Sequence, residues 1–285
     1  MRRLVALGSS AVSLDRNRGK GEPIDGARYI VGDVSREALE AVDFVPETIF
    51  HLAGGAAAAG SVANPLEDFL KTVLSTAILL DFLRINWPET HLVFVSSAAI
   101  YGQAADKRAS RDDAYLPISP YGVHKRQAEL LVLGYARIYQ IKPAIVRGFS
   151  VYGPGCRKQL LWDAMEKASA GIFEFAGSGR EMRDWVYVAD FVESLLRISA
   201  YSGTDVPVMN AGTCHGTSVR EVLTELFRIA GFDREPVFPG GDREGDPPSL
   251  VAGDSLEEML GPLFVTRLAD GLAAYVRWYK TVKHR

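Results

Sequence analysis

A serine, a tyrosine and a lysine are the residues of this chain best suited to acid–base chemistry. Ser97 ends an apolar run that starts at His91, and Tyr121 and Lys125 follow, spaced Tyr-x-x-x-Lys, at the start of a helical pattern. Tyrosine is a poor base near its ordinary pKa of about 10. A lysine one helical turn away favours the phenolate through its charge. Brought together, the three groups could take a proton from an alcohol.

The spacing Tyr-x-x-x-Lys is weak evidence by itself, because it occurs again at Tyr279 and Lys283. That second pair lies at an expected helix end, where a lysine suits the helix dipole. No serine at the end of a strand precedes it. The first pair differs because its helix follows a strand that ends in Ser96 and Ser97. This context favours a functional role for the first pair only.

The elements that must position these residues alternate between strand and helix. The strands are expected at 11–14, 28–31, 48–52, 92–96 and 144–146. Helical periodicity covers 66–84 and 121–139, and in the second half 158–169, 188–200, 218–229 and 267–280. Strands that are apolar throughout and alternate with helices predict a parallel sheet covered on both faces, which is a doubly wound α/β fold. A change of texture near residue 150 predicts a first lobe over 1–150 and a smaller lobe over 151–285.

Composition excludes several classes of protein. The chain has 285 residues, 47% of them hydrophobic and 24% charged, with a net charge of −3 and no basic run. Neither a nucleic-acid partner nor a membrane span is expected. The two cysteines, Cys156 and Cys214, predict a reducing compartment, and hence a cytoplasmic location. The five histidines lack the spacing of a metal site, so no metal is expected.

Several further motifs follow one another in a recognisable order. They are Gly32-Asp33-Val34, His51-Leu52-Ala53-Gly54, Arg147-Gly-Phe-Ser-Val-Tyr-Gly-Pro-Gly155, Gly179-Arg-Glu-Met-Arg-Asp-Trp-Val-Tyr-Val188 and Asn210-Ala-Gly-Thr213. With Ser97, Tyr121 and Lys125 they resemble the extended short-chain dehydrogenase/reductase family, in its nucleotide-sugar epimerase and dehydratase branch. The resemblance covers nearly the whole chain. It implies a Rossmann-like first lobe (1–150) that binds NAD, a second lobe (151–285) that binds a nucleotide-diphosphate sugar, and a homodimer.

The resemblance also implies roles for the first three residues. Tyr121 would be the general acid and base, Lys125 would hold the nicotinamide ribose and lower the tyrosine pKa, and Ser97 would hydrogen-bond the reacting hydroxyl. The 4,6-dehydratases of this family place an acid pair directly after that serine. Ala98 and Ala99 stand there instead and cannot transfer protons. The run therefore looks more like that of the 4-epimerases.

Cofactor and substrate contacts follow from the same resemblance. Asp15 would bind the adenosine ribose, which favours NAD over NADP, although the adjacent Arg16 could accept a 2′-phosphate. The other expected cofactor contacts are Asp33, Val34, Leu52, Ala53 and Gly54. The substrate diphosphate would be bound by Arg183 and Arg243, since a guanidinium suits phosphate geometry; the alternative for each is a surface salt bridge with Asp184 or Asp246. Ser150 stands where the family usually has asparagine.

A glycine-rich turn between a first strand and a first helix is absent near the start of the sequence. Residues 1–7 resemble the end of the first helix with Gly8 as its cap, and 10–15 the second strand, so about 20 residues of the fold are missing. Three interpretations remain. The sequence begins downstream of the true start, which we favour; or the chain is a degenerate relative that binds the dinucleotide poorly; or 3–7 is itself the central strand. Gly54, Gly55 and Gly60 could form a substitute phosphate loop, although close packing explains them better.

The function expected from the sequence is that of an NAD-dependent nucleotide-sugar 4-epimerase with transient oxidation at C4. A nucleotide-sugar 4-keto reductase is the first alternative. The second is a non-catalytic relative that binds a nucleotide sugar, which the absent glycine turn motivates.

Overall fold

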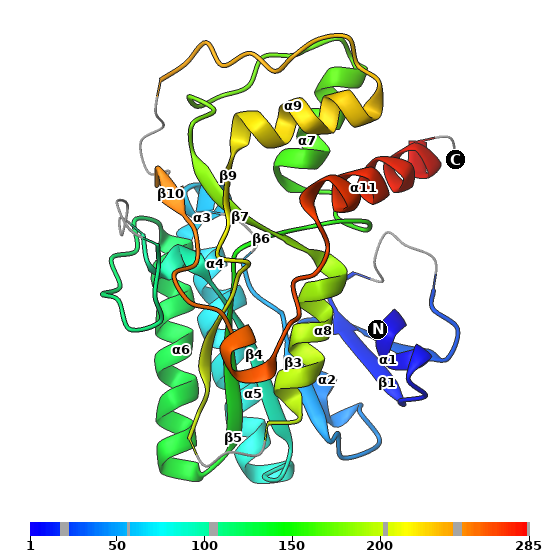
Figure 1. Ribbon diagram of the computed structural model, residues 1–285. Coiled ribbons are helices and arrows are strands. Elements are labelled where there is room, and N and C mark those ends of the chain that lie inside the picture. Colours follow the sequence, from blue (N-terminus) through cyan, green and yellow to red (C-terminus); the bar gives the residue numbers. More distant parts are fainter. Residues whose placement is uncertain (18–22, 56–57, 103–107, 202–204, 242–246, 284–285) are drawn as a thin grey trace.

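A parallel sheet of four strands forms the centre of the molecule (Figure 1). The computed structural model describes residues 1–17, 23–55, 58–102, 108–201, 205–241 and 247–283. The sheet has the order β3-β4-β5-β8, with β3 (Thr48–His51), β4 (His91–Ser97), β5 (Lys142–Gly148) and β8 (Val208–Ala211). Both inner strands are apolar along most of their length, as a sheet covered on both faces requires.

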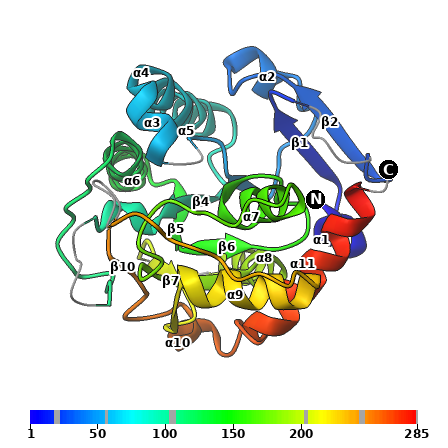
Figure 2. The ribbon, with the colours of Figure 1, turned by 90° about the horizontal axis from the view of Figure 1, so that it is seen from above.

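Helices cover both faces of this sheet (Figure 2). On one face lie α5 (Ser75–Asn86) and α6 (Pro120–Tyr139), which pack on β4 and β5 through a core that includes Leu80, Phe94 and Val132. The other face is covered by α8 (Val188–Ser199), whose Phe191 and Leu195 pack against Val146. The predicted doubly wound α/β fold is therefore confirmed.

The strands and long helices predicted from periodicity are found within a few residues of their expected bounds. The helical pattern over 66–84 is more complicated than expected. It comprises α4 (Pro65–Phe69), a π-helical segment η1 (Leu70–Leu74) and then α5. Such π-segments occur mainly where a helix serves a functional site, and η1 lies close to the site described below.

Two further strands stand apart from the central sheet. β1 (Ala11–Asp15) pairs in parallel with β2 (Ala27–Val31), and α2 (Arg36–Glu40) follows. Among the described residues, no strand pairs with the second edge of β1 or with that of β3. Residues 2–6 form a helix, α1 (Arg2–Ala6), and Gly8 follows with a φ of +77°. The interpretation of 3–7 as a central strand is therefore wrong, and the helical interpretation is confirmed.

The C-terminal half adds a second, smaller sheet with its own core. Its strands are β6 (Ser150–Tyr152), β7 (Met182–Tyr187), β9 (Gly216–Ser218) and β10 (Ser249–Leu250). Three helices pack around a separate apolar core: α7 (Gln159–Ser169), α9 (Val219–Ala230) and α11 (Leu268–Lys283). A short helix, α10 (Glu257–Leu260), lies between α9 and α11 in the sequence. Ser218 and Glu221 form the expected capping box of α9. The division at residue 150 stays a prediction.

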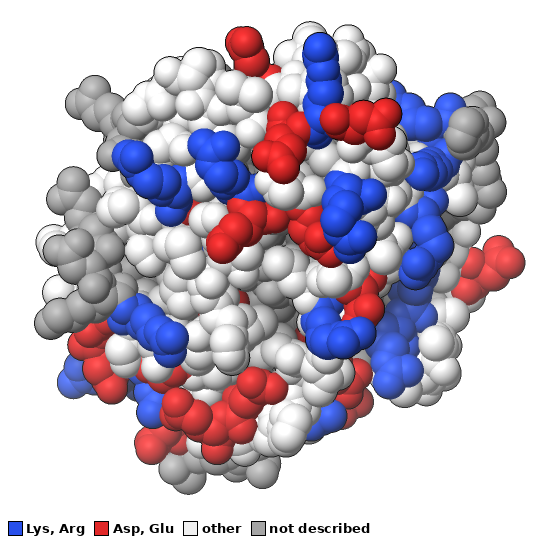
Figure 3. Space-filling model, turned by 45° about the horizontal axis from the view of Figure 1, so that its top comes forward, with Lys and Arg blue, Asp and Glu red and all other residues white. Residues whose placement is uncertain are grey.

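The surface carries charges of both signs on the face seen in Figure 3. Within the described ranges no helix has the length and apolar content needed to cross a bilayer. In that same part of the chain, no group of three or more His, Cys, Asp or Glu side chains is arranged to hold a metal ion.

Candidate active site

Ser97 and Tyr121 meet where the end of β4 approaches the start of α6. The Ser97 hydroxyl accepts a hydrogen bond from the backbone N–H of Ala99 (3.2 Å), which begins the short 3₁₀ helix η2 (Ala98–Ile100). Helix α6 starts at Pro120 with Ser119 as its N-cap. A Cβ atom at Gly122 would lie 2.5 Å from the carbonyl oxygen of Ala99. Glycine at this position therefore allows α6 to approach η2 closely enough for Tyr121 to reach Ser97.

The pKa of the Tyr121 phenol is set by opposing effects. Burial raises its pKa, a hydrogen bond with Ser97 lowers it, and the negative charge of Asp68 raises it again, so that the net direction is upward. The backbone N–H of Tyr121 also donates to the hydroxyl of Ser61 (2.9 Å), which lies in α3 (Ala58–Ala63). The tyrosine is thus fixed from two sides and can donate a proton at neutral pH.

Lys125 lies one turn further along α6 and is almost fully buried. Its ammonium donates to the carbonyl oxygen of Val95 (2.9 Å) and lies 5.3 Å from the centre of the Phe94 ring. Burial lowers its pKa from 10.5 to about 8, although Asp68 and Glu129 act in the opposite direction. In this structure the interaction that lowers the pKa of Tyr121 is the hydrogen bond with Ser97, whereas the sequence assigned that effect to Lys125.

Two acid–base groups beside this pair were missed by the sequence analysis. Asp68 of α4 is 6% exposed, and its carboxylate lies 2.6 Å from Nδ1 of His124, which stands between Tyr121 and Lys125 in α6. Because a carboxylate can only accept, the imidazole donates the proton of this hydrogen bond. In the sequence Asp68 resembles a solvated acid in the first turn of a helix, so no signal pointed to its burial.

The turn after β3 is held against the same group of residues. The N–H of Gly55 donates to the hydroxyl of Thr72 (2.9 Å), which belongs to the π-segment η1. A Cβ atom at Gly55 would collide with the carboxylate of Asp68 and would lie 3.3 Å from the Tyr121 ring. A Cβ atom at Gly54 would lie 3.2 Å from Nζ of Lys125. These contacts favour the packing interpretation of the two glycines.

A buried ion pair supports the site from behind. Arg147 of β5 is 1% exposed and forms two hydrogen bonds with the carboxylate of Glu129 on α6. The same guanidinium donates to the hydroxyls of Tyr101 (2.8 Å) and Tyr115 (2.9 Å). The network ties the segment that follows Ser97 to the helix that carries Tyr121, and so fixes their relative position.

The residues expected to bind the adenosine ribose lie at the carboxyl end of β1. Asp15 is exposed and accepts a hydrogen bond from the N–H of Asn17 (2.9 Å). Arg16 forms an exposed ion pair with Asp33 (3.4 Å), and Val34 packs against the core under α5. At the end of β3 the side chain of Leu52 is 58% exposed, and Ala53 and Gly54 follow. Their cofactor roles stay predictions.

The expected substrate residues belong to the second sheet. Ser150 lies on β6 and pairs with Trp185 of β7. Arg183 lies on β7, where its guanidinium donates to the carbonyl of Met182 (2.8 Å). Arg243 lies outside the described residues. Next to Arg183, the buried Asp184 accepts hydrogen bonds from Thr213 and from the N–H groups of Cys214 and Ala252, and so ties the loop after β8 and the segment after β10 to β7.

The second Tyr-x-x-x-Lys pair has a different environment. The hydroxyl of Tyr279 and the ammonium of Lys283 both bind the carboxylate of Glu166, at 2.7 Å and 2.6 Å. They therefore join the end of α11 to α7. No strand-borne serine takes part in these contacts, and the pair has a structural role.

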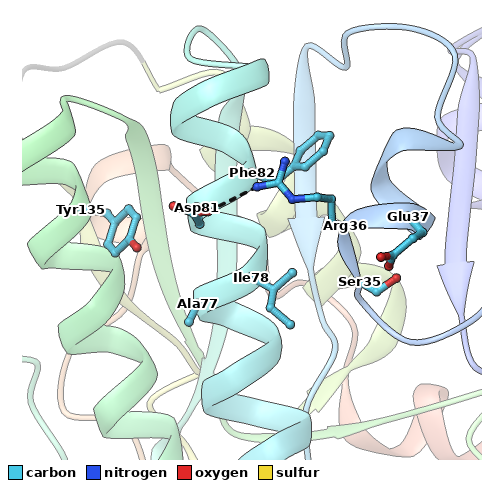
Figure 4. Close-up of a pocket in the computed structure, with 8 residues that line it drawn as sticks. All are labelled: Ser35, Arg36, Glu37, Ala77, Ile78, Asp81, Phe82 and Tyr135. Atoms are coloured by element: carbon cyan, nitrogen blue, oxygen red, sulfur yellow. Dashed lines mark ion pairs between the residues drawn. The ribbon is translucent and has the colours of Figure 1, made fainter.

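A shallow hollow of about 490 Å³ lies between α2, α5 and α6 (Figure 4). Arg36 reaches across it to Asp81 (3.5 Å) and lies over the ring of Phe82. Tyr135, which lines the hollow, is 14 residues beyond Tyr121 on α6, about 21 Å along the helix axis. The hollow is therefore separate from the acid–base residues.

Comparison with known proteins agrees with this fold. Residues 1–212 match the model of the NAD dependent epimerase/dehydratase family. A UDP-glucose 4-epimerase of Azospirillum brasilense is 30% identical over 285 residues, which covers 90% of this chain and 81% of that protein. A UDP-glucose 4-epimerase of Mycolicibacterium smegmatis is 28% identical and covers 98% of this chain and 93% of its own length. The chain is a doubly wound α/β enzyme, and it belongs to the NAD dependent epimerase/dehydratase family.

Solved structures resemble the chain over almost its whole length. The UDP-glucose 4-epimerase of Thermotoga maritima, solved with UDP-glucose, has a TM-score of 0.89 at 27% identity and covers 99% of this chain and 94% of its own. MoeE5, solved with UDP-glucuronic acid and NAD, has a TM-score of 0.87 at 30% identity and covers 98% of this chain and 94% of its own.

Proposed function

We propose that this protein is a nucleotide-sugar 4-epimerase that uses NAD. The observation that carries the proposal is the meeting of Ser97, Tyr121 and Lys125 at the carboxyl end of β4, in a chain similar to UDP-glucose and UDP-glucuronate 4-epimerases. A UDP-sugar is the substrate class favoured by these relatives. The absence of acidic side chains at Ala98 and Ala99 supports epimerisation over dehydration.

The proposed mechanism assigns each step to a group of this chain. In the oxidative step Tyr121 acts as the phenolate, a form that the hydrogen bond with Ser97 favours against the effect of burial. Its Oη takes the proton of the sugar 4-hydroxyl while Ser97 hydrogen-bonds the same hydroxyl. When bound, NAD would supply the chemistry of a reversible hydride acceptor for C4. After the 4-keto sugar has rotated so that the opposite face of C4 lies toward the nicotinamide end, the hydride would return to that face and Tyr121 returns the proton to the 4-oxygen. Lys125 contributes a buried positive charge beside the phenol and the nicotinamide ribose.

The residues present fit the two ends of a dinucleotide. Asp15 lies at the end of β1, where a ribose diol would be bound, and Lys125 lies beside the Gly54-Gly55 turn, near the proposed nicotinamide end. Between β1 and β3, the described residues supply no glycine-rich turn for the pyrophosphate. The ion pair of Arg16 with Asp33 supports NAD over NADP, because that guanidinium already binds a carboxylate.

The direct test is turnover of UDP-glucose, UDP-galactose and UDP-glucuronate by the purified protein with added NAD, with products separated by anion-exchange chromatography. We expect interconversion of 4-epimers without net consumption of NAD. Tyr121→Phe should lower kcat by roughly 10²- to 10⁴-fold, which is what acid–base catalysis contributes. Tyr279→Phe is the matched control, since its hydroxyl binds Glu166 far along another helix, and it should keep full activity.

Two other outcomes would favour the alternatives. Stoichiometric consumption of NADPH with a 4-keto sugar would indicate a reductase. Binding of a UDP-sugar without turnover, and without measurable NAD binding by calorimetry, would indicate a non-catalytic relative. Equal activity of the Tyr121→Phe and Tyr279→Phe variants would exclude the proposed mechanism.

We further propose that the protein forms a homodimer through α4–α5 and α6. Exposed apolar side chains recur at helical spacing on these adjacent elements, as Leu66, Leu70 and Leu74 on one and Val123 and Leu130 on the other. An exposed apolar stripe is a surface that a second copy of the chain would cover. Sedimentation velocity should show a dimer that Leu70→Glu converts to a monomer; a monomeric native protein contradicts the proposal.

A cytoplasmic location is also proposed. Both cysteines, Cys156 and Cys214, are free thiols, as is usual in a reducing compartment.

A further inference from the structure

Asp68 and Lys125 contact two adjacent residues of the turn after β3: a Cβ atom at Gly54 would lie 3.2 Å from Nζ of Lys125, and one at Gly55 would collide with the carboxylate of Asp68. No step of the proposed mechanism uses Asp68. It comes from α4, is buried, and contacts the turn at Gly55 so closely that only glycine fits there. On its other side it is bound by His124 at 2.6 Å, and the imidazole in turn packs edge-on against the ring of Phe69. A buried carboxylate that is hydrogen-bonded and packed in this way keeps a fixed position.

The titratable groups that act on Lys125 come from three elements. Glu129 of α6 is already bound by the guanidinium groups of Arg126 and Arg147. His51 of β3 is uncharged, because burial and the charge of Lys125 lower its pKa to about 3. Asp68 of α4 is paired with an imidazole instead of a guanidinium. It is also the strongest of the charges that raise the pKa of Lys125 against the effect of burial.

We propose that Asp68 and His124 are a positioning pair, which holds a negative charge beside Lys125 so that this buried lysine keeps its proton at neutral pH. Without the carboxylate, desolvation would favour the uncharged amine. The catalytic meaning of the pair rests on the proposed function. Its effect on the protonation of Lys125 does not, and can be measured without turnover.

The test is an NMR titration of protein labelled with [ε-¹³C]lysine, in which the Lys125 signal is identified by its loss in Lys125→Met. In the native protein the inflection is expected near pH 8. In Asp68→Asn it should move to lower pH, so that the lysine is largely uncharged at neutral pH. Glu67→Gln is the matched control: this acid is the preceding residue of α4, is exposed and pairs with Lys71, so its loss should leave the inflection unchanged.

A second set of variants covers the case in which Asp68→Asn does not fold. His124→Leu removes the hydrogen bond that holds the carboxylate and should move the inflection in the same direction by a smaller amount. His124→Asn, whose amide N–H can take the place of Nδ1, should restore it. An inflection that stays at its native position in Asp68→Asn, or in His124→Leu where Asp68→Asn is unfolded, overturns the proposal. An equal shift in Glu67→Gln overturns it as well.

Enzyme kinetics then separate positioning from simple loss of structure. In a folded Asp68→Asn protein we expect kcat at pH 7 to fall about tenfold, less than the roughly 10²-fold or larger loss of a direct acid–base group. The KM for the UDP-sugar should stay nearly constant, and the alkaline limb of the kcat profile should move to lower pH. An inactive native protein would refute the proposed function and leave the titration result standing.

Discussion

The two sides of the proposed cofactor site are built very differently. On one side lies the catalytic sheet, by which we mean β3, β4, β5 and β8 with α6, where Ser97, Tyr121 and Lys125 are held by buried hydrogen bonds. On the other side lies the β1–β2 pair, with Asp15 exposed at the end of a strand that has one neighbour. The proposed acid–base residues are thus held by a sheet of four strands, whereas the proposed adenosine site is held by a single pair of strands.

The difference shows where fixed geometry is required. A proton transfer depends on distances of a few tenths of an ångström, so the phenol needs support from several elements. A ribose diol needs one correctly placed carboxylate, which the end of a short strand supplies. The following predictions test this contrast, beginning with the largest expected effect.

The ion pairs of the two regions should differ most. Arg147→Met leaves Glu129 buried without its main partner and should lower the free energy of unfolding by about 3–5 kcal/mol. Arg16→Met removes an exposed pair with Asp33 and should cost less than about 1 kcal/mol. Urea denaturation of both variants measures the difference. Similar values would mean that the two regions are equally well supported.

Hydrogen exchange should separate the two regions in the native protein. β4 and β5 each have two neighbouring strands and are covered by helices on both faces, whereas β1 and β2 form a single ladder. Amides of the β1–β2 pair should exchange roughly 100-fold faster, because local opening there breaks fewer contacts. Mass spectrometry of peptic fragments measures the ratio. Added NAD should reduce it, and equal protection in both regions would contradict the contrast.

The acid stability of the catalytic sheet should depend on His51. Burial and the nearby Lys125 lower its pKa to about 3, so the unfolded chain binds a proton between about pH 6.5 and pH 3 that the folded chain does not. The free energy of unfolding should therefore fall as the pH falls through this range. His51→Gln should flatten the dependence. His215→Gln, at an exposed position, should leave the pH dependence of the unfolding free energy unchanged. If His51→Gln keeps the pH dependence of the native protein, His51 is not its cause.

The smallest effect is expected at Asp15. Asp15→Asn should weaken NAD binding about tenfold, since a charge-assisted hydrogen bond to the ribose is worth about 1.4 kcal/mol or more. The free energy of unfolding should stay unchanged, because the side chain is exposed. Isothermal titration calorimetry measures the affinity, with the exposed Asp25→Asn as control. Unchanged affinity in Asp15→Asn would remove this residue from the cofactor site.

Much of the fold was predictable because its information is local. Apolar runs at 92–96 and 144–146 and the periodicity over 121–139 correspond to β4, β5 and α6. The helix at the start of the chain also followed from motif order. The π-segment η1 was not predicted, because the choice between α and π geometry depends on contacts such as that between Thr72 and Gly55.

The sequence by itself determined which groups could do acid–base chemistry, since Ser97, Tyr121 and Lys125 are recognisable by type, spacing and order. It could not determine that Asp68 and His124 lie beside them, because a buried acid and an exposed one look the same in a helical pattern. Only the tertiary structure decided this point, since burial and charge proximity arise when α4, the turn after β3 and α6 pack together.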